Sequence, residues 1–241
     1  MRGSFAKLVE ALETRLEDGG TELFLSDPVQ RIERGAGNLT IFTRESSWTA
    51  DLILVATPVP DYLDIAGHLL ADDERSRLAD LRATGAICTV LELEHSLTPY
   101  YWLNIADPKM PFGGLIEHTN YIARKRYGGR HILYISNYLF PDHPLFHAPK
   151  KQIIALYLPA LKRVNSAFNS SSIIKSHHFR AEYAQPVVPV GYRNRIPPFR
   201  QSVDGLYLCT MAQIFPEDRG QNYAVAYGEK VARTMLKDIG H

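Results

Sequence analysis

The sequence predicts an α+β fold made of two lobes, and three segments carry that prediction. A continuous apolar run at 51–58 is typical of a strand that is covered on both faces. A second apolar strand at 205–210 precedes a helix-forming run that reaches Lys237. The stretch between them, from Thr84 onward, is rich in strands. Because the two apolar strands need each other to cover their faces, we expect the C-terminus to complete the lobe that the N-terminus begins.

The N-terminal elements follow from hydrophobic spacing and turn residues. Apolar residues at helical spacing predict a first helix that ends at Gly19-Gly20, namely Phe5, Leu8, Val9, Leu12 and Leu16. Alternating or β-branched runs predict strands at 21–25, 28–34 and 38–44, and another that begins at Trp48. Gly35-Ala36-Gly37 predicts a hairpin turn between two of them. A short helix is expected at 72–81.

The middle of the chain predicts a mixed sheet flanked by helices, one of them long. Strands are expected at 84–93, 100–105, 113–118, 131–138 and 173–183. The helix is expected to begin at Pro149 or Lys150 and to run to Val164. A proline-rich connection at 186–198 leads back toward the closing strand.

Composition excludes several classes of protein. The 241 residues carry a formal net charge of +1, which gives no reason to expect nucleic acid or an anionic membrane as a partner. No apolar run reaches the ~18 residues of a membrane span. Cys88 and Cys209 both lie in apolar runs, and we expect free thiols in a reducing, cytoplasmic setting rather than a disulfide.

The C-terminal strand, polar loop and helix form a candidate site for an anion or a polar ring. The unpaired N–H groups and the positive dipole end of a helix N-terminus face whatever is bound there. Dinucleotide-binding folds also hold the pyrophosphate in a glycine-rich turn, and no G-x-G-x-x-G occurs in these 241 residues. The chain is therefore expected to carry half of a cofactor site.

Candidate acid–base and substrate-binding residues lie in the middle segment. Glu117 and His118 could exchange protons with a substrate, or could simply end a strand in a polar turn. The cluster Arg124-Lys125-Arg126 with Arg130 could meet an anionic substrate, or could be a solvated loop. Four histidines fit no closed zinc pattern, so no metal is expected (His143, His147, His177 and His178).

Four segments together resemble the C-terminal portion of the flavin-containing amine oxidase superfamily, which includes protoporphyrinogen oxidase-like and phytoene desaturase-like enzymes. They are the glycine and helix at 3–12, the strand at 28–32, the apolar strand at 50–58 and the closing segment at 205–228. The resemblance runs through the chain in order, and it lacks the N-terminal glycine-rich dinucleotide-binding part. It implies an incomplete FAD-binding lobe at 1–58 with 203–241, and a substrate-binding lobe at 59–202.

The resemblance also implies roles for individual residues. Val29 would contact the adenine through main-chain hydrogen bonds, and Thr57 and Pro58 would lie along the cofactor. The turn Arg219-Gly220-Gln221-Asn222 would face the flavin ring, with Val225 packed behind it. Tyr192 and Arg193, in the proline-rich connection, would lie near the ring and could line the substrate site.

Two departures from the family pattern bear on the reaction. An acidic residue usually follows the closing strand, where this chain has Cys209-Thr210-Met211. Many amine-oxidising members carry a lysine in the long strand that begins the substrate lobe, and the segment 86–90 has none. Both differences argue against amine oxidation and leave desaturase-like or redox-neutral flavin chemistry open.

Three functions remain in competition at this point. The first is an FAD-dependent oxidoreductase that acts on a small-molecule substrate, of which this chain is a C-terminal fragment unable to bind FAD alone. The second is a redox-neutral flavoenzyme similar to the UDP-galactopyranose mutases. The third is a non-catalytic domain that binds a small molecule without a cofactor.

Overall fold

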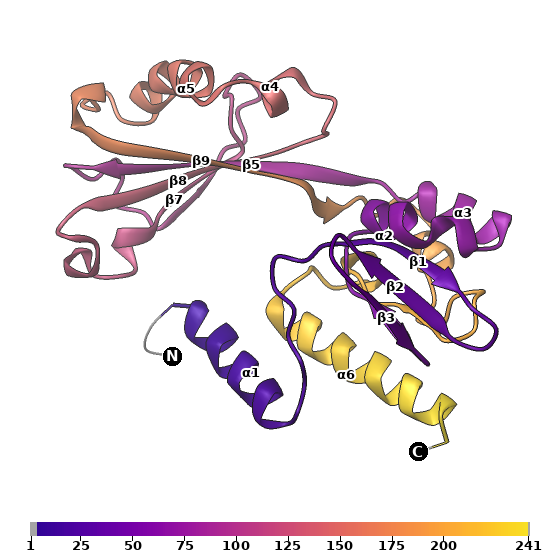
Figure 1. The fold of residues 1–241 in the computed structure, drawn as a ribbon. Coiled ribbons are helices and arrows are strands. Elements are labelled where there is room, and N and C mark those ends of the chain that lie inside the picture. The colour runs from indigo at the N-terminus through magenta and orange to yellow at the C-terminus, as the bar shows by residue number, and fades with distance from the viewer. Residues whose placement is uncertain (1–3, 241) are drawn as a thin grey trace. The chain divides into compact units, whose positions relative to one another are not determined.

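The computed structural model describes residues 4–240, which form two compact units. Unit 1 runs to Leu78 and also contains Pro197–Thr210 and the residues from Ala226 onward. Unit 2 contains Ala79–Ile196 and Met211–Val225. Helices and strands are mixed in both units (Figure 1), as the α+β prediction requires.

Unit 1 begins with helix α1 (Ala6–Asp18), followed by a three-stranded antiparallel meander. Its strands are β1 (Val29–Arg34), β2 (Leu39–Thr43) and β3 (Ser47–Ala50), in the order β1-β2-β3. Ile32 and Leu39 are each 1% exposed and anchor the first hairpin. The predicted helix, the three strands and the turn at 35–37 are therefore confirmed.

The strand expected at 21–25 is wrong. Residues 21–25 have no regular secondary structure, and Phe24 and Leu25 are 55% and 75% exposed. The Phe24 ring instead contacts Trp48 of β3, with ring centres 4.6 Å apart. An extended segment becomes a strand only where a neighbouring backbone accepts and donates its hydrogen bonds, and this segment makes a side-chain contact in place of that ladder.

The two apolar strands of the prediction pair with each other. Strands β4 (Ile53–Val55) and β10 (Leu206–Leu208) form a parallel two-stranded sheet, with Val55 in register with Leu208. The expected proximity of these distant segments is confirmed. Burial on both faces of β4 is not found, because Leu54 is 38% exposed while its neighbours are buried.

Polar contacts hold the segment at 200–202 to two helices of unit 1. The buried carboxylate of Glu74, in α3 (Asp72–Ala79), accepts hydrogen bonds from the backbone N–H of Ser202 at 3.2 and 3.1 Å. Arg200 donates two hydrogen bonds of 2.6 Å to Asp238 in the last turn of α6 (Gln221–Asp238). The Arg200 bonds, followed by the Tyr207 hydroxyl, lower the pKa of Asp238 to about 2.

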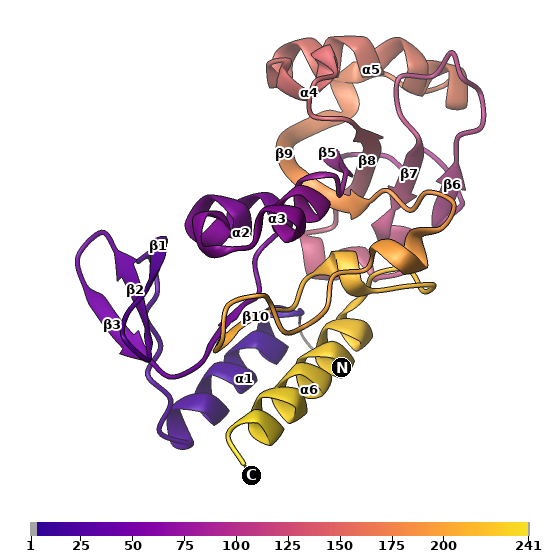
Figure 2. The same ribbon diagram turned by 90° about the vertical axis from the view of Figure 1, so that its right-hand side faces the viewer.

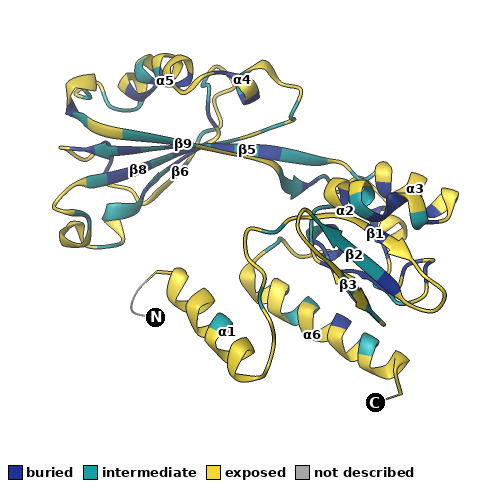
Figure 3. Cartoon of the chain, viewed as in Figure 1, coloured by how far each residue is buried: buried dark blue, intermediate teal, exposed yellow. Residues whose placement is uncertain are grey.

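The two terminal helices expose most of their surface (Figure 3). No residue of α1 is buried, although its apolar face was predicted from the helical spacing of Leu8, Leu12 and Leu16. Val231 is the buried residue of α6. Among residues 4–240, no helix combines the length and apolarity that crossing a bilayer requires.

Unit 2 is built on a five-stranded antiparallel sheet in the order β6-β7-β8-β5-β9. Its strands are β5 (Ala83–Leu93), β6 (Trp102–Asn104), β7 (Gly114–Glu117), β8 (His131–Leu139) and β9 (Ile173–Pro186). Helices α4 (Pro144–His147) and α5 (Lys150–Val164) lie against one face of this sheet (Figures 1 and 2). The strands and the long helix agree with the prediction, but every strand pair of the sheet is antiparallel, so the sheet is not mixed as expected. The short α4 was not predicted.

The core of unit 2 lies between this sheet and α5. Alternate residues of β5 face the helix layer, and Ile87, Leu91 and Leu93 are at most 1% exposed. They pack with Phe146, Ile153 and Tyr157 of the two helices. Burying each such side chain contributes about 1.5–3 kcal/mol. Cys88, on β5, is a free cysteine, and burial raises the pKa of its thiol. The described residues contain no group of side chains that could hold a metal ion.

Gly205 is required by the close approach of β4 and β10, which gives a first prediction. Its φ is +80°, and a Cβ there would lie 2.6 Å from the carbonyl oxygen of Asp51. Gly191 has nearly the same φ, +79°, with no described atom within 4 Å of such a Cβ. We expect Gly191→Ala to lower the free energy of unfolding by about 1–2 kcal/mol, the cost of the left-handed conformation.

Gly205→Ala should lower the free energy of unfolding in urea by about 2–5 kcal/mol, because a steric overlap of about 1–3 kcal/mol is added to the same backbone cost. The comparison isolates the contact with Asp51. Equal losses for the two variants would show that the close approach does not constrain the strand pair.

Candidate functional site

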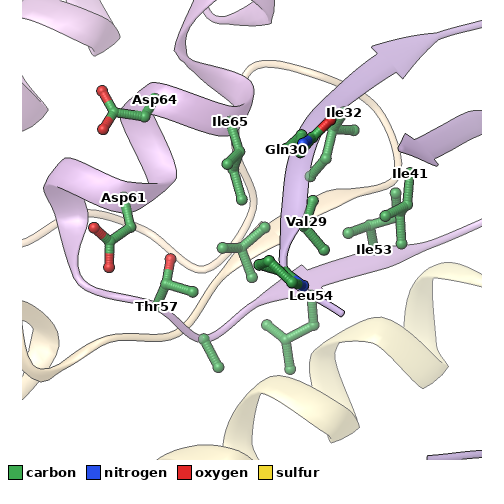
Figure 4. A pocket seen from close by; sticks show the side chains of 13 residues that line it. Val29, Gln30, Ile32, Ile41, Ile53, Leu54, Thr57, Asp61, Asp64 and Ile65 are labelled. Atoms are coloured by element: carbon green, nitrogen blue, oxygen red, sulfur yellow. The ribbon is translucent and has the colours of Figure 1, made fainter. Parts of the chain in front are cut away.

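A pocket of about 620 Å³ opens at the beginning of β1 in unit 1. Figure 4 shows the apolar side chains of Val29, Ile41 and Ile53 on one side, and Asp61 and Asp64 on the other. Its lining comes from β1, β2, β4 and helix α2 (Val59–Ala66). The complete lining is Pro28, Val29, Gln30, Ile32, Ile41, Ile53, Leu54, Val55, Ala56, Thr57, Asp61, Asp64 and Ile65.

β1 is an edge strand, and this position gives the pocket its main-chain groups. Val29 pairs with Thr43 and Arg31 pairs with Phe42, so Gln30 is the extra residue of a bulge. An edge strand has N–H and C=O groups on its outer side that no second strand uses, and a bulge redirects them locally. The segment that contains Val29 and Gln30 can therefore offer both a donor and an acceptor to a ligand in the pocket.

Helix α2 supplies the polar side of the pocket. The strand β4 ends before Thr57, and Pro58, with ψ of 152°, occupies the N-cap position of α2. Asp61, Asp64 and Ile65 then fall on one helical face through their i, i+3 and i+4 spacing. The sequence analysis expected Thr57 and Pro58 to lie along a cofactor; Thr57 lines this pocket, and Pro58 is not among its lining residues. The sequence analysis missed α2 and its two carboxylates. The repeat of aspartate at this spacing after a proline was the available signal.

The chemistry of the pocket suits a flat, uncharged ring with hydroxyl groups nearby. Apolar side chains favour a ring face, edge-strand backbone groups can bind ring nitrogens, and carboxylates accept hydrogen bonds from hydroxyls. No lysine or arginine is among the lining residues. The pocket therefore fits an adenosine-like group and not the pyrophosphate of a dinucleotide.

The turn before α6 belongs to unit 2, whereas the pocket belongs to unit 1. Arg219 donates a 3.0 Å hydrogen bond to the Tyr138 hydroxyl, and its guanidinium carbon lies 5.6 Å from the centre of that ring. Helix α6 begins at Gln221, and the N–H groups of Tyr223 and Ala224 both bond to the carbonyl of Gly220 at 3.0 Å. Asn222 occupies the second helical position, and Val225 is 61% exposed.

Glu117 is held inside unit 2 by backbone donors. Its side chain is 0% exposed and accepts hydrogen bonds from the N–H groups of Leu97 at 3.3 and 3.0 Å and of Thr98 at 2.8 Å. His131 Nδ1 lies 3.5 Å from the same carboxylate. These contacts hold the loop at 96–98 against the end of β7. The buried carboxylate therefore has hydrogen-bond partners of its own and a structural role.

The other three catalytic candidates also have defined partners. His118 Nε2 lies 2.6 Å from the Tyr127 hydroxyl, and burial lowers the pKa of His118. Tyr192 is 2% exposed and donates a 2.6 Å hydrogen bond to the carbonyl of Ala212. Arg193 stacks over the Phe215 ring at 5.7 Å. Tyr192 and Arg193 therefore connect the proline-rich segment to the segment that precedes the turn at 219–222.

The comparisons with known proteins agree with this architecture. A putative protoporphyrinogen oxidase from Exiguobacterium sp. 255-15 matches with a TM-score of 0.68 and 17% identity over 95% of this chain and 51% of that one. An oxidoreductase from Methanosarcina mazei matches with a TM-score of 0.66 and 17% identity, over 94% of this chain and 53% of that one. Cyclohexylamine oxidase from Brevibacterium oxydans IH-35A matches with a TM-score of 0.63 and 14% identity, over 89% of this chain and 49% of that one.

At these identities the likeness establishes the fold, and the chain spans about half the length of the solved structures it matches. No relative among curated proteins matches it. The model of the family described as flavin containing amine oxidoreductase, in contrast, matches residues 1–236, nearly the whole sequence. The chain therefore belongs to the flavin-containing amine oxidoreductase family.

Proposed function

We propose that this chain forms part of an FAD-dependent oxidoreductase that acts on a small-molecule substrate in the cytoplasm. The observation that carries the proposal is the apolar pocket beside the edge strand β1, in a chain whose family binds flavin. FAD would supply the electron-transfer chemistry, and the protein would supply binding, orientation and electrostatics. Unit 1 would serve the cofactor, and the sheet of unit 2 the substrate, close to the lobes expected at 1–58 with 203–241 and at 59–202.

The adenosine end of the cofactor would occupy the pocket at β1. The backbone of Val29 would bind the adenine edge, because edge-strand groups can donate and accept hydrogen bonds at the same place. Asp61 or Asp64 would accept hydrogen bonds from ribose hydroxyls. Thr57 and Pro58 would continue this surface between β4 and α2.

The turn Arg219-Gly220-Gln221-Asn222 would face the flavin ring. Its N–H groups open an 18-residue helix, so the positive dipole end stabilises negative charge placed there. Val225, one turn further along, would pack behind this contact. Tyr192, Arg193 and His118 would be substrate-side residues, while the backbone contacts of Glu117 favour a positioning role for that carboxylate.

The absence of G-x-G-x-x-G from the sequence predicts weak cofactor retention by these 241 residues. Glycine-rich turns provide most of the pyrophosphate anchoring in dinucleotide folds, and nothing in the pocket at β1 replaces it. We expect the purified chain to be colourless. Absorption spectroscopy, with quantification of flavin released by denaturation, measures this, and stoichiometric FAD in a yellow preparation would contradict it.

The pocket itself should bind adenosine without the rest of the cofactor. We expect Ile65→Trp to lower the affinity for adenosine at least about tenfold, because the indole fills space that the base needs. Ile239→Trp is the matched control, since Ile239 is 50% exposed and does not line the pocket. Isothermal titration calorimetry compares the variants, and equal affinities for both would remove the pocket from the cofactor site.

Asn222→Leu tests the turn in the complete FAD-binding protein of which we propose this chain is a part, and not in the 241-residue chain alone. Loss of one polar contact to the ring should cost on the order of 1–3 kcal/mol and shift the flavin reduction potential. If Asn222 merely supports the helix start, the melting temperature should fall while the potential stays unchanged. Spectroelectrochemical titration decides between these outcomes, and an unshifted potential with unchanged FAD affinity would rule out the contact.

A further inference from the structure

A second pocket, of about 450 Å³, lies in unit 2 between β9 and the start of α5. We call it the basic pocket, after Lys150, His178 and Arg180, and its remaining lining is Pro149, Ser176, His177 and Phe179. No carboxylate is among these lining residues. Its residues are separate from those of the pocket at β1 and from the turn at 219–222.

Strand register explains why the basic side chains converge. Arg180 pairs with Ile87, His178 with Thr89 and Ser176 with Leu91. Directly paired residues of an antiparallel sheet share a face, and Ile87 and Leu91 face the helix layer. The side chains of Arg180 and His178 therefore also lie on the side of α5.

The first residues of α5 complete the cluster. Lys150 opens the helix, and its Nζ donates to the carbonyl of Ser176 at 3.3 Å. Arg180 donates to the carbonyl of Ala148, just before the helix. The first turn of this 15-residue helix contains no acidic residue. Two basic side chains and the positive end of a helix dipole thus share one pocket that has no acidic residue in its lining.

His178 gives an independent indication of a ligand. Its Nδ1 lies 2.9 Å from the hydroxyl of Thr89, which is 1% exposed. Its Nε2 is buried and has no hydrogen-bond partner among the described residues. When the Thr89 hydroxyl donates to Nδ1, Nε2 carries the proton and becomes a buried donor that lacks an acceptor. An unpaired buried donor destabilises the folded protein, and a bound acceptor would remove that penalty.

The basic groups near the histidines line the basic pocket, whereas the nearby carboxylate of Glu92 lies on the other face of the sheet. Burial, followed by the charges of Arg180 and Lys150, lowers the pKa of His178, which favours the neutral ring. Glu92 lies 3.0 Å from His177 Nε2 and also pairs with Arg130. Glu92 and His177 alternate with Leu91 and His178 along their strands and so belong to the opposite face of the sheet.

We propose that the basic pocket binds a phosphate group, either as free phosphate or as part of a small phosphorylated metabolite. Lys150 and Arg180 would neutralise its charge, and the Nε2–H of His178 and the backbone N–H groups at the start of α5 would donate to its oxygens. The site is independent of the proposed FAD function, because no residue of the cofactor site takes part in it.

The test is a titration of the 241-residue chain with inorganic phosphate and, separately, with glycerol 3-phosphate, at constant ionic strength maintained with chloride. We expect saturable binding with one site by calorimetry, and a shift of the His178 Nε2 resonance in nitrogen NMR spectra. Tighter binding of glycerol 3-phosphate than of phosphate would identify a phosphorylated metabolite, and the reverse would identify free phosphate.

Variants at the exposed Lys150 keep the test independent of folding. Lys150→Ala should weaken binding at least about tenfold, the loss of one charge-assisted contact. Lys151→Ala and Lys175→Ala are matched controls that leave the lining intact, and they should bind as the unaltered chain does. His178→Gln should also weaken binding. Absence of saturable binding, or equal effects of Lys150→Ala and Lys151→Ala, would overturn the proposal.

Discussion

The parallel pairing of β4 with β10 is the contact on which unit 1 depends. It joins residues more than 150 positions apart through three register pairs, and it brings Val55 and Leu208 into one buried layer. Near this pair, Glu74 accepts a hydrogen bond from the backbone of Ser202, and Asp238 accepts hydrogen bonds from Arg200 and Tyr207. Without this pair the segment at 197–210 would have no backbone partner in β4. The pocket at β1 would then lose the wall formed by Ile53, Leu54 and Val55.

The same pairing explains why the pocket at β1 is formed by a strand that depends on a distant segment of the sequence. β4 leads directly through Thr57 into α2, which places two carboxylates opposite the edge strand β1. β10 leads toward the turn at 219–222 and the start of α6. A cofactor with two chemically different ends needs two such surfaces, one apolar with hydroxyl acceptors and one that stabilises developing negative charge. The family assignment and these two surfaces support one proposal from independent directions.

Sequence patterns predicted the regular elements well where periodicity was sustained. The strands β5, β8 and β9 and the helices α1, α5 and α6 were all expected, because each has a long run with a clear period. The short α2 was missed because a proline after an apolar strand indicates a stop and can equally begin a helix. The strand expected at 21–25 failed because its apolar residues contact Trp48 through side chains, which composition cannot distinguish from strand pairing. For the sites, Val29 and Thr57 were expected from family resemblance, and both line the pocket at β1. The basic pocket depends on the register of β9 against β5 and could not be predicted from spacing.

The central claim is that the pocket at β1 receives the adenosine end of a flavin cofactor. A chemical-shift map of the amide-labelled chain titrated with adenosine tests it most directly, because adenosine has no phosphate and does not engage the basic pocket. The account predicts saturable shifts at Val29, Gln30 and Thr57 and along α2, with those at Lys150 and Arg180 unchanged. Shifts confined to unit 2, or no saturable shifts at β1 and α2, would contradict it.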